Sequence, residues 1–373
     1  MPRGRSAMPK HYRIEHTTRF VYDSPVRESV MEVRMKPRDE WGQQCLAFDL
    51  RTTPRANVHA YRDPLGNAVH YFDIPRTHLS QTVTAVAQVR VDALDVEPVD
   101  IPGDFDRLPA CYAEDPGCWE MTLPSNFARP TSRLEAFADR IGAERAESTL
   151  NTADRLCRLV HEHLTYAPDT TDAESTIDQA IDQGGGVCQD FAHVLIALLR
   201  RVGMPARYVS GYLFRGTFAD TPPQSQSLWQ ADDPQRLAGQ TQQQSMQQAE
   251  SADDPTRGAT HAWVEAYIPD HGWIGLDPTQ AQRVAKTHIR TAVGRDYTDV
   301  PPTRGVYRGN SQGQMEVAVT VAELATPDTL KPIAPPPLER TGWTPPEPLP
   351  DVPDEPKPFE YYAQQMQQQQ RQS

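Results

Sequence analysis

The spacing of the apolar residues changes near Thr131, and this change divides the chain into two folding units. Before it, residues 10–92 contain short runs rich in β-branched and aromatic residues, such as HYRIEHTTRFVY and LSQTVTAVAQVRV, separated by turn formers such as DPLGN. Short strands without helical periodicity predict an antiparallel β-sandwich or barrel. After it, SRLEAFADRI and NTADRLCRLVHEHLTY have helical spacing, each opened by a Ser, Thr or Asn cap candidate.

The second unit combines helices and strands. Residues 187–202 place apolar side chains at the i, i+3, i+4, i+7 positions of a buried helix face. The runs MPARYVSGYLF and THAWVEAYIPDHGWIGLDPT then return to strand patterns. We therefore expect an α+β core over residues 131–320, preceded by the β domain. Residues 93–130, rich in Pro, Asp and Gly, are predicted to be an ordered linker.

Two polar segments are predicted to remain unpacked. Residues 215–258 form a Gln-rich insertion, and residues 321–373 form a Pro-rich and then Gln-rich tail. The chain has 35 prolines and a mean hydropathy of −0.63. Such segments bury too little apolar surface to offset the entropy lost on ordering. We expect a disordered tail, solvated or holding a protein partner, and an insertion that is either passive or a lid.

Composition restricts the partners and the compartment. The formal net charge of −13 argues against binding to nucleic acid or an anionic membrane surface. No run of 18 apolar residues could span a membrane, and the start MPRGRSAMPKHYRIEH has no apolar core of a secretory signal, whether Met1 or Met8 begins the chain. Five scattered cysteines without a CxxC pair suit free thiols and a cytoplasmic location. Cys111 and Cys118 could form a disulfide or half a metal site, but no second ligand pair follows.

The stretch IDQGGGVCQDFAHVLIALLRRVG places Cys188 after three glycines, at the first turn of a predicted helix. Unpaired N–H groups and the positive end of the helix dipole favour a thiolate there, and could hold the oxyanion of a tetrahedral intermediate. The glycines fit a turn of unusual backbone angles and leave room for a substrate. However, free cysteine is often buried, and position 188 continues the apolar stripe of the helix. This motif alone favours a buried core thiol.

His261 is the second candidate residue. The run THAWVEAYI alternates, so that His261 shares one strand face with Trp263, Glu265 and Tyr267, while small and aliphatic residues occupy the other. The small face suits the core, and the face with His261 could line a cleft. A single histidine in a strand is more often structural, so this position is a candidate only together with Cys188.

Asp277 follows His261 by 16 residues, on a strand that returns after the turn PDHG. A loop of three or five residues, or a bulge, would bring the two onto one face of neighbouring strands, whereas an even loop would place them on opposite faces. DHG, ending in Gly272, fits a three-residue turn that closes on a left-handed glycine. That register leaves the residues several positions apart, so a longer loop or a bulge is an alternative, as is a plain turn role before Pro278.

These motifs resemble a known family. GGGVCQDFA, LLRRVGMPARYVSGYL and THAWVEAYIPDHGWIGLDPT are similar to the core of the bacterial transglutaminase-like superfamily, a branch of the papain-like fold. HTTRFVYDSPVRES and DPLGNAVHYFDI resemble the β domain that precedes this core, and HIRTAVGRDYTDVPPTRGVYRG resembles the stretch that follows it. The resemblance covers about residues 10–320. It implies Cys188 as nucleophile, His261 as general base and acid, and Asp277 as the partner that orients His261. The segment before THAW is usually short in such proteins, whereas here it contains the Gln-rich insertion of residues 215–258.

The chemistry that this resemblance implies is acyl transfer through a thioester. Water as the second nucleophile would make the protein a cysteine protease or amidase, and a primary amine would make it a transglutaminase. We expect hydrolysis of a peptide, protein or amide substrate, because excluding water requires special architecture. An inert binding or scaffold module is a third reading. No cofactor or metal is expected; zinc on Cys188, His261 and Asp277 suits the ligand types but not the resemblance.

Overall fold

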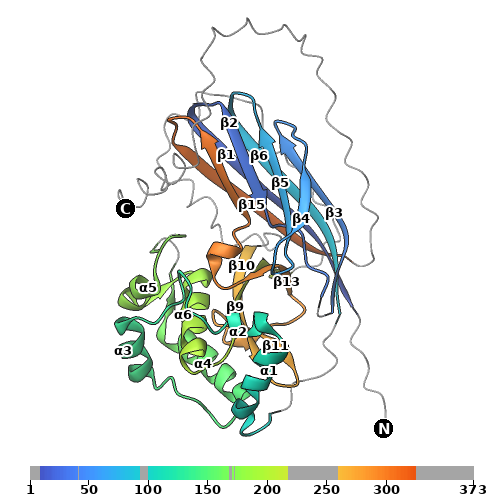
Figure 1. The fold of residues 1–373 in the computed structure, drawn as a ribbon. Helices are drawn as coiled ribbons and strands as arrows, with labels where there is room; N and C mark the ends of the chain where they lie inside the picture. Colours follow the sequence, from blue (N-terminus) through green and yellow to red (C-terminus); the bar gives the residue numbers. More distant parts are fainter. Residues whose placement is uncertain are drawn as a thin grey trace, which may run out of the picture. The chain divides into compact units, whose positions relative to one another are not determined.

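The computed structural model describes residues 9–40, 42–92, 100–167, 170–171, 173–216 and 259–324 (Figure 1). Most of the Gln-rich insertion and the whole tail beyond residue 324 therefore lie outside the described residues. The prediction that these two segments remain unpacked therefore stays a prediction from the sequence. Within the described part of the chain, no helix is long and apolar enough to cross a membrane.

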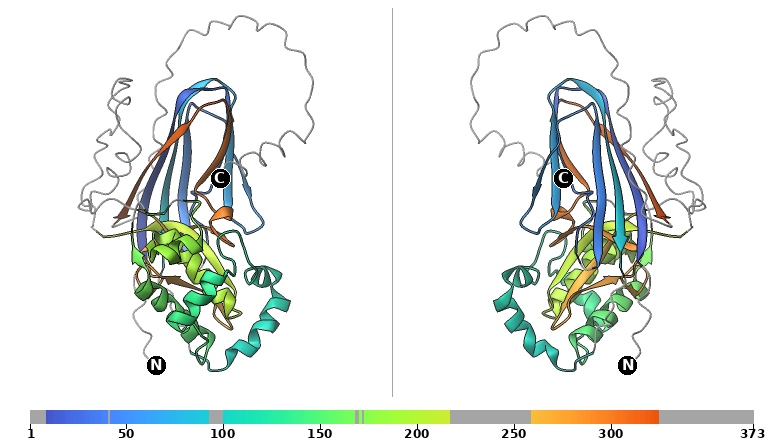
Figure 2. Two further views of the ribbon diagram at one scale, coloured as in Figure 1. Left: turned by 90° about the vertical axis from the view of Figure 1, so that its left-hand side faces the viewer. Right: turned by 90° about the vertical axis from the view of Figure 1, so that its right-hand side faces the viewer.

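The N-terminal domain is a sandwich of two four-stranded antiparallel sheets, visible as two layers in Figure 2. One sheet has the order β15-β1-β6-β3 and the other β14-β2-β5-β4. Apolar side chains that alternate along the strands, among them Met31, Phe72 and Val83, pack between the sheets. The strands that precede the linker are β1 (Lys10–Val26), β2 (Glu28–Val33), β3 (Gln43–Thr53), β4 (His59–Arg62), β5 (Ala68–Ile74) and β6 (His78–Val91).

The sandwich is completed by two strands from the far end of the described chain. β14 (Thr303–Arg308) pairs with β2, and β15 (Gly313–Leu324) pairs with β1 along twelve residues. The expected end of the catalytic core at residue 320 and the expected start of the tail at residue 321 are both wrong, because β14 and β15 belong to the sandwich. This pairing joins segments about 300 residues apart, so the spacing of apolar residues within either segment cannot predict it.

The segment expected to be a linker contains short helices that join the core. It folds into a 3₁₀-helix, Asp104–Arg107, followed by α1 (Leu108–Glu114) and α2 (Pro116–Glu120). Leu108 and Ala128 are buried in the main hydrophobic core. Helices of one or two turns are too short to show a helical period, which explains why the sequence predicted no elements here.

The second domain packs helices against a five-stranded sheet, which confirms the α+β class. The sheet order is β12-β11-β10-β9-β13. Its strands are β9 (Ala206–Leu213), β10 (Ala259–Ile268), β11 (Gly272–Asp277), β12 (Gln282–Arg283) and β13 (His288–Gly294), with a 3₁₀-helix at Tyr297–Asp299. The helices are α3 (Ser132–Ile141), α4 (Thr149–His163), α5 (Ile177–Gln183) and α6 (Cys188–Arg201), and a separate parallel pair is formed by β7 (Thr165–Tyr166) and β8 (Gly185–Gly186).

Helix α6 is the centre of this domain. It packs on β9 and β10 and is contacted by α3, α4 and α5 (Figure 1). Residues 189–199 are buried without interruption, so the helix is enclosed on every side rather than on the single face that its apolar spacing predicted. Only its first turn, at Cys188, and its last residues lie nearer the surface.

The sandwich docks on the edge strand β13 through two buried side-chain amides. Gln43 accepts a hydrogen bond from the Arg290 N–H (2.8 Å) and donates one to the Arg290 carbonyl (2.9 Å). Asn67 does the same at Val293, at 2.8 and 2.9 Å. An edge strand exposes unpaired backbone groups, and these amides satisfy them in the way that a further strand would.

We expect Asn67→Ala to destabilise the protein strongly. The substitution leaves the buried N–H and carbonyl of Val293 without partners, which should lower the free energy of unfolding by about 3 kcal/mol. Urea unfolding measures the change, with the exposed Asn126→Ala as control, expected to stay within about 0.5 kcal/mol. Equal small effects of both variants would contradict this account of docking.

Candidate active site

The three glycines that precede α6 are required for different reasons. Gly184 ends α5 in the left-handed conformation, with φ of 68°. Gly185 and Gly186 are extended in β8, where added side chains would collide with neighbours. A Cβ on Gly185 would lie 2.3 Å from the Thr165 carbonyl oxygen, and one on Gly186 would lie 2.4 Å from Asp190 Oδ2. Only the first glycine therefore has unusual backbone angles, which corrects the expectation for the run as a whole.

Asp190 fixes the turn that enters the helix. Its Oδ2 accepts hydrogen bonds from the Val187 N–H at 2.8 Å and from the Thr171 hydroxyl at 2.7 Å. A carboxylate in the first turn also interacts favourably with the helix dipole. Asp190 therefore has a structural role at the entry to α6.

Two backbone N–H groups remain available at the start of α6. The N–H groups of Asp190 and Phe191 donate to the Val187 carbonyl at 3.0 and 3.2 Å. Among the described residues, no hydrogen bond is found for the N–H groups of Cys188 and Gln189. The first N–H groups of a helix have no acceptor within it, so these two donors lie beside the Cys188 sulfur and can receive an anionic oxygen.

The β10–β11 hairpin places His261 and Asp277 on one sheet face. Ile268 pairs with Gly272, so the loop contains three residues, 269–271. Continuing this register sets Asp277 opposite Trp263, diagonal to His261 and on the same face. The odd loop expected from the sequence is confirmed, although it begins one residue earlier and Gly272, with φ of 76°, is already the first residue of β11.

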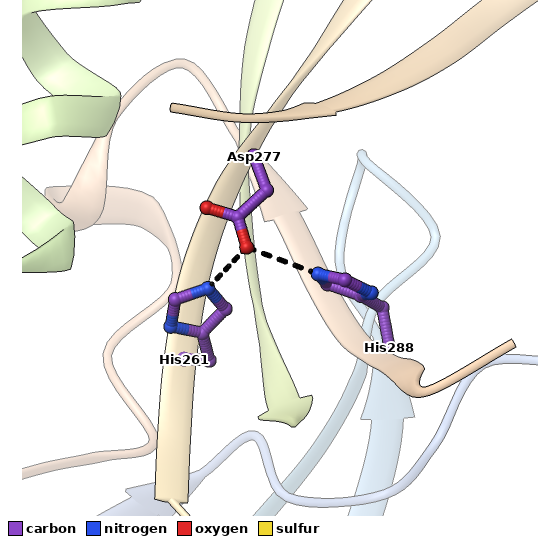
Figure 3. A group of neighbouring side chains, drawn as sticks. All are labelled: His261, Asp277 and His288. Carbon is purple, nitrogen blue, oxygen red and sulfur yellow. Dashed lines mark hydrogen bonds and ion pairs between the residues drawn. The ribbon is translucent and has the colours of Figure 1, made fainter. Parts of the chain in front are cut away.

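His261 connects the strand pair to the helix. Its Nε2–H donates to Asp277 Oδ2 at 2.8 Å (Figure 3). The other ring nitrogen, Nδ1, is not used by Asp277, and Cys188 lies close enough to His261 to raise the pKa of the ring. The structure thus brings together the three residues proposed from the sequence: Cys188 from α6, His261 from β10 and Asp277 from β11.

The surroundings of His261 favour its protonated form. Burial lowers the pKa of this imidazole, but the hydrogen bonds to Asp277 and Cys188 and their negative charges outweigh the burial. They raise the pKa of His261 to about 9. At neutral pH the ring is therefore a cation beside the Cys188 side chain.

Asp277 is fully buried and accepts four hydrogen bonds. Oδ1 receives the Thr279 N–H at 2.9 Å and the Thr279 hydroxyl at 2.6 Å. Oδ2 receives the N–H of His261 at 2.8 Å and that of His288 at 3.1 Å (Figure 3). Burial raises the pKa of the Asp277 carboxyl, but these donors and the charge on His261 lower it well below its usual range. The carboxylate is thus ionised and its orientation is fixed.

His288 is the site residue that the sequence analysis missed. It lies at the start of β13 with its side chain fully buried. The Ala285 N–H donates to His288 Nδ1 at 3.3 Å, which leaves the proton on Nε2, the atom that donates to Asp277. One sequence feature pointed to His288, because it begins the stretch HIRTAVGRDYTDVPPTRGVYRG, which resembles the family. Its contact with a residue eleven positions earlier was not visible in strand spacing.

A pocket of about 460 Å³ opens beside His261. Its walls include Tyr166 on β7, the residues that follow β9, and the turn after Asp277. The Tyr166 side chain is half exposed at its rim. Tyr166 thus lines the pocket next to the reacting histidine. By contrast, His161 and His163 are exposed on α4 and do not line this pocket.

His261, Asp277 and His288 are also of the residue types that bind zinc. Their ligand atoms lie within 4.8 Å of one another, and all three residues are buried. The structure uses the same atoms for hydrogen bonds, two of which end on one carboxylate oxygen. A metal ion bound there would displace the proton between His261 and Asp277, and so would compete with the pairing of His261 and Cys188.

Comparison with known proteins assigns both domains. A family described as the bacterial transglutaminase-like N-terminal region matches residues 12–90, and the transglutaminase-like superfamily matches residues 135–278, which include Cys188, His261 and Asp277. An uncharacterized protein of Mycobacterium leprae is 31% identical over 313 residues, covering 84% of this chain and 99% of that protein.

Two further comparisons concern named activities. A protein-glutamine gamma-glutamyltransferase of Pseudomonas aeruginosa is 28% identical over 149 residues, covering 39% of this chain and 18% of that protein. The crystal structure of a candidate cysteine protease from Cytophaga hutchinsonii superposes with a TM-score of 0.61 at 19% identity, covering 87% of this chain and 94% of that one. The second similarity is one of fold.

We expect Cys188 to react with iodoacetamide faster than the other four cysteines near neutral pH. All five are free thiols. Burial raises the pKa of Cys45 to about 11 and those of Cys118 and Cys157 to about 12, so their thiolates are scarce. Peptide mass spectrometry over a time course gives each rate, with half-buried Cys111 as reference. Equal rates at all five positions would contradict a Cys188 thiolate stabilised by His261.

We expect His288→Phe to destabilise the site more than His288→Gln. Phenylalanine leaves buried Asp277 one donor short, which should lower the free energy of unfolding by about 1–3 kcal/mol, whereas glutamine retains an N–H donor. Urea unfolding and the rate of Cys188 alkylation are measured for both variants, with exposed His161→Phe as control. If both His288 variants behave like the control, the hydrogen bond to Asp277 contributes nothing.

Proposed function

This chain belongs to the transglutaminase-like superfamily, and from that premise we propose that it is a cysteine-dependent hydrolase of peptide or amide bonds. One observation carries the proposal. Cys188 lies close enough to His261 to raise its pKa, and His261 in turn donates to the buried Asp277 carboxylate. This is the arrangement of a nucleophile, a base and the group that orients the base.

The first half of the reaction forms a thioester. The Cys188 sulfur attacks the carbonyl carbon of the amide, and the carbonyl oxygen becomes an anion. The protonated His261 then gives its Nδ1 proton to the departing nitrogen, so that the C–N bond breaks and an amine leaves. Asp277 holds the ring in place through both half-reactions and stabilises its charged form.

The second half releases the acid. His261, now neutral, takes a proton from water, and the water oxygen attacks the thioester carbon. The C–S bond breaks, and the sulfur leaves as a thiolate beside the reprotonated ring. In both halves, the N–H groups of Cys188 and Gln189 are the donors suited to the developing oxyanion, because no described residue accepts from them.

Hydrolysis is favoured over amine transfer by access of water. The pocket beside His261 is bordered by Tyr166, which is 49% exposed, so water can reach the base that would activate it. Transglutaminase activity needs water to be excluded until an amine arrives. Amine transfer remains the second candidate, supported by the named activity of the relative from Pseudomonas aeruginosa.

A binding or scaffold module with an inert site is the third candidate. The proximity of Cys188, His261 and Asp277 argues against it. A buried carboxylate that raises the pKa of a neighbouring histidine is typical of a functional site. The expected cytoplasmic location and a protein partner for the tail are kept as proposals that rest on composition alone.

We expect peptides and γ-glutamyl amides to be cleaved in water, with little incorporation of an added primary amine. Mass spectrometry of the products, with and without the amine, separates the two reactions. Cys188→Ala should abolish both, and Asp277→Asn should lower kcat by about 10⁴-fold. Amine incorporation that exceeds hydrolysis would favour the transglutaminase, and unchanged turnover in Cys188→Ala would refute the proposal.

We expect kcat/KM to fall as the pH rises through about 9. The pKa of His261 is raised from 6.5 to about 9, so the ring carries its proton at neutral pH and loses it above that value. Without this proton the leaving nitrogen cannot be protonated. A pH–rate profile measured with one peptide substrate tests this; an alkaline limb near 6.5 would show that Asp277 and Cys188 do not hold the proton.

A further inference from the structure

The pocket beside His261 has an unusual charge for this protein. Among the residues that the structure describes, Arg215 is the only lysine or arginine that lines it, and no aspartate or glutamate lines it. The chain as a whole has 50 acidic residues against 37 basic ones. A pocket with a cation and no acidic side chain is therefore unlike the average surface of the molecule, and attracts negative charge.

Arg215 has no acidic partner in the part of the chain that the structure describes. About half of the other arginines there, such as Arg207 and Arg290 on Glu265, are in ion pairs. The guanidinium of Arg215 is exposed and lines the pocket instead. A planar guanidinium binds a carboxylate through two parallel hydrogen bonds when no protein group already occupies it.

The backbone that carries Arg215 is firmly anchored. The preceding residue, Phe214, donates its N–H to the Thr287 carbonyl at 2.9 Å, and its buried ring packs 5.2 Å from the ring of Tyr12. The arginine therefore starts from a fixed point two residues beyond β9, the strand that pairs with β10 at His261. This fixed start limits how far the guanidinium can lie from the reacting histidine.

The other walls of the pocket suit a short acidic side chain. Phe214 and Tyr166 offer apolar surface to methylene groups, while Thr279, Gln280 and Thr287 offer uncharged hydrogen-bonding groups. None of them provides a negative charge for a protonated amine. Thr279 also donates to Asp277, so this wall is continuous with the residues that hold His261.

We propose that this pocket binds the carboxylate of an acidic peptide substrate through Arg215, close to the amide that Cys188 attacks. The inference rests on the proposed function and adds a substrate class to it. The carboxylate belongs either to an Asp or Glu side chain or to the C-terminus of the peptide. A lysine at the same place is repelled by Arg215, which also disfavours lysine as an acyl acceptor on this side of the site.

The test uses peptide sets that differ at one position only, scanned along the sequence. Each set has Glu, Gln or Lys at that position and an amidated C-terminus, and a parallel set has Gln there and a free C-terminal carboxylate. At the position that meets the pocket, kcat/KM for Glu, or for the free carboxylate, should exceed that for Gln by about tenfold at low salt. High salt should reduce the ratio.

Two variants of Arg215 test whether this residue causes the preference for acidic peptides. Arg215→Gln should abolish it, and Arg215→Glu should reverse it in favour of Lys. Arg308→Glu, at an exposed arginine of β14 outside the pocket, changes the net charge equally and should leave the preference unchanged. A preference for acidic peptides that survives in Arg215→Gln, or no preference at any position, would overturn the inference while leaving hydrolysis intact.

A binding measurement separates this inference from the proposed function. Calorimetry of the same peptides with the full-length Cys188→Ala variant needs no turnover. Tighter binding of the acidic peptide that is lost on adding Arg215→Gln supports the pocket even if no peptide is cleaved. Equal binding of the Glu, Gln and Lys peptides refutes it, whatever the wild-type protein hydrolyses.

Discussion

The burial of the Asp277 carboxylate constrains the rest of the site. An ionised carboxylate away from water is strongly unfavourable unless hydrogen-bond donors replace the lost hydration. Four donors do so, and they come from β10, from the turn after β11 and from β13. These three segments must therefore keep one mutual arrangement. The geometry of His261 follows from it, because the ring is held by the carboxylate and not by its own strand alone.

The same requirement links the N-terminal sandwich to the site. His288 donates to Asp277 from β13, and β13 is the edge strand on which the sandwich docks. The amides of Gln43 and Asn67 hold the backbone of that strand at two points beyond His288. The β domain is thus more than a neighbour of the catalytic domain. It supplies the missing edge partner of a strand that carries a residue of the site.

The five cysteines show how surroundings decide the chemistry of one residue type. Cys118 and Cys157 are buried, and burial raises the pKa of each to about 12, which makes them part of the core. Cys188 lies at the free start of a helix, beside free backbone donors and against the charged ring of His261. The glycines before it are needed to bring the chain this close to Asp190 and to β7.

Local patterns in the sequence predicted elements and faces. The helix start at Cys188 follows from glycines and apolar spacing, and the common face of His261 and Asp277 follows from the parity of a three-residue loop. The prediction that the three residues meet rested on the family resemblance, because no spacing relates a helix to a strand 73 positions later.

Partners distant in the chain were decided only by the tertiary structure. In the tertiary structure β14 and β15 pair with the sandwich, short helices of the linker pack on the core, and His288 donates to Asp277. Arg215 lies in a pocket that no described acidic residue lines. The physical reason is that periodicity records which side of an element is buried. Which groups from elsewhere satisfy a buried charge depends on how the sheets and helices pack.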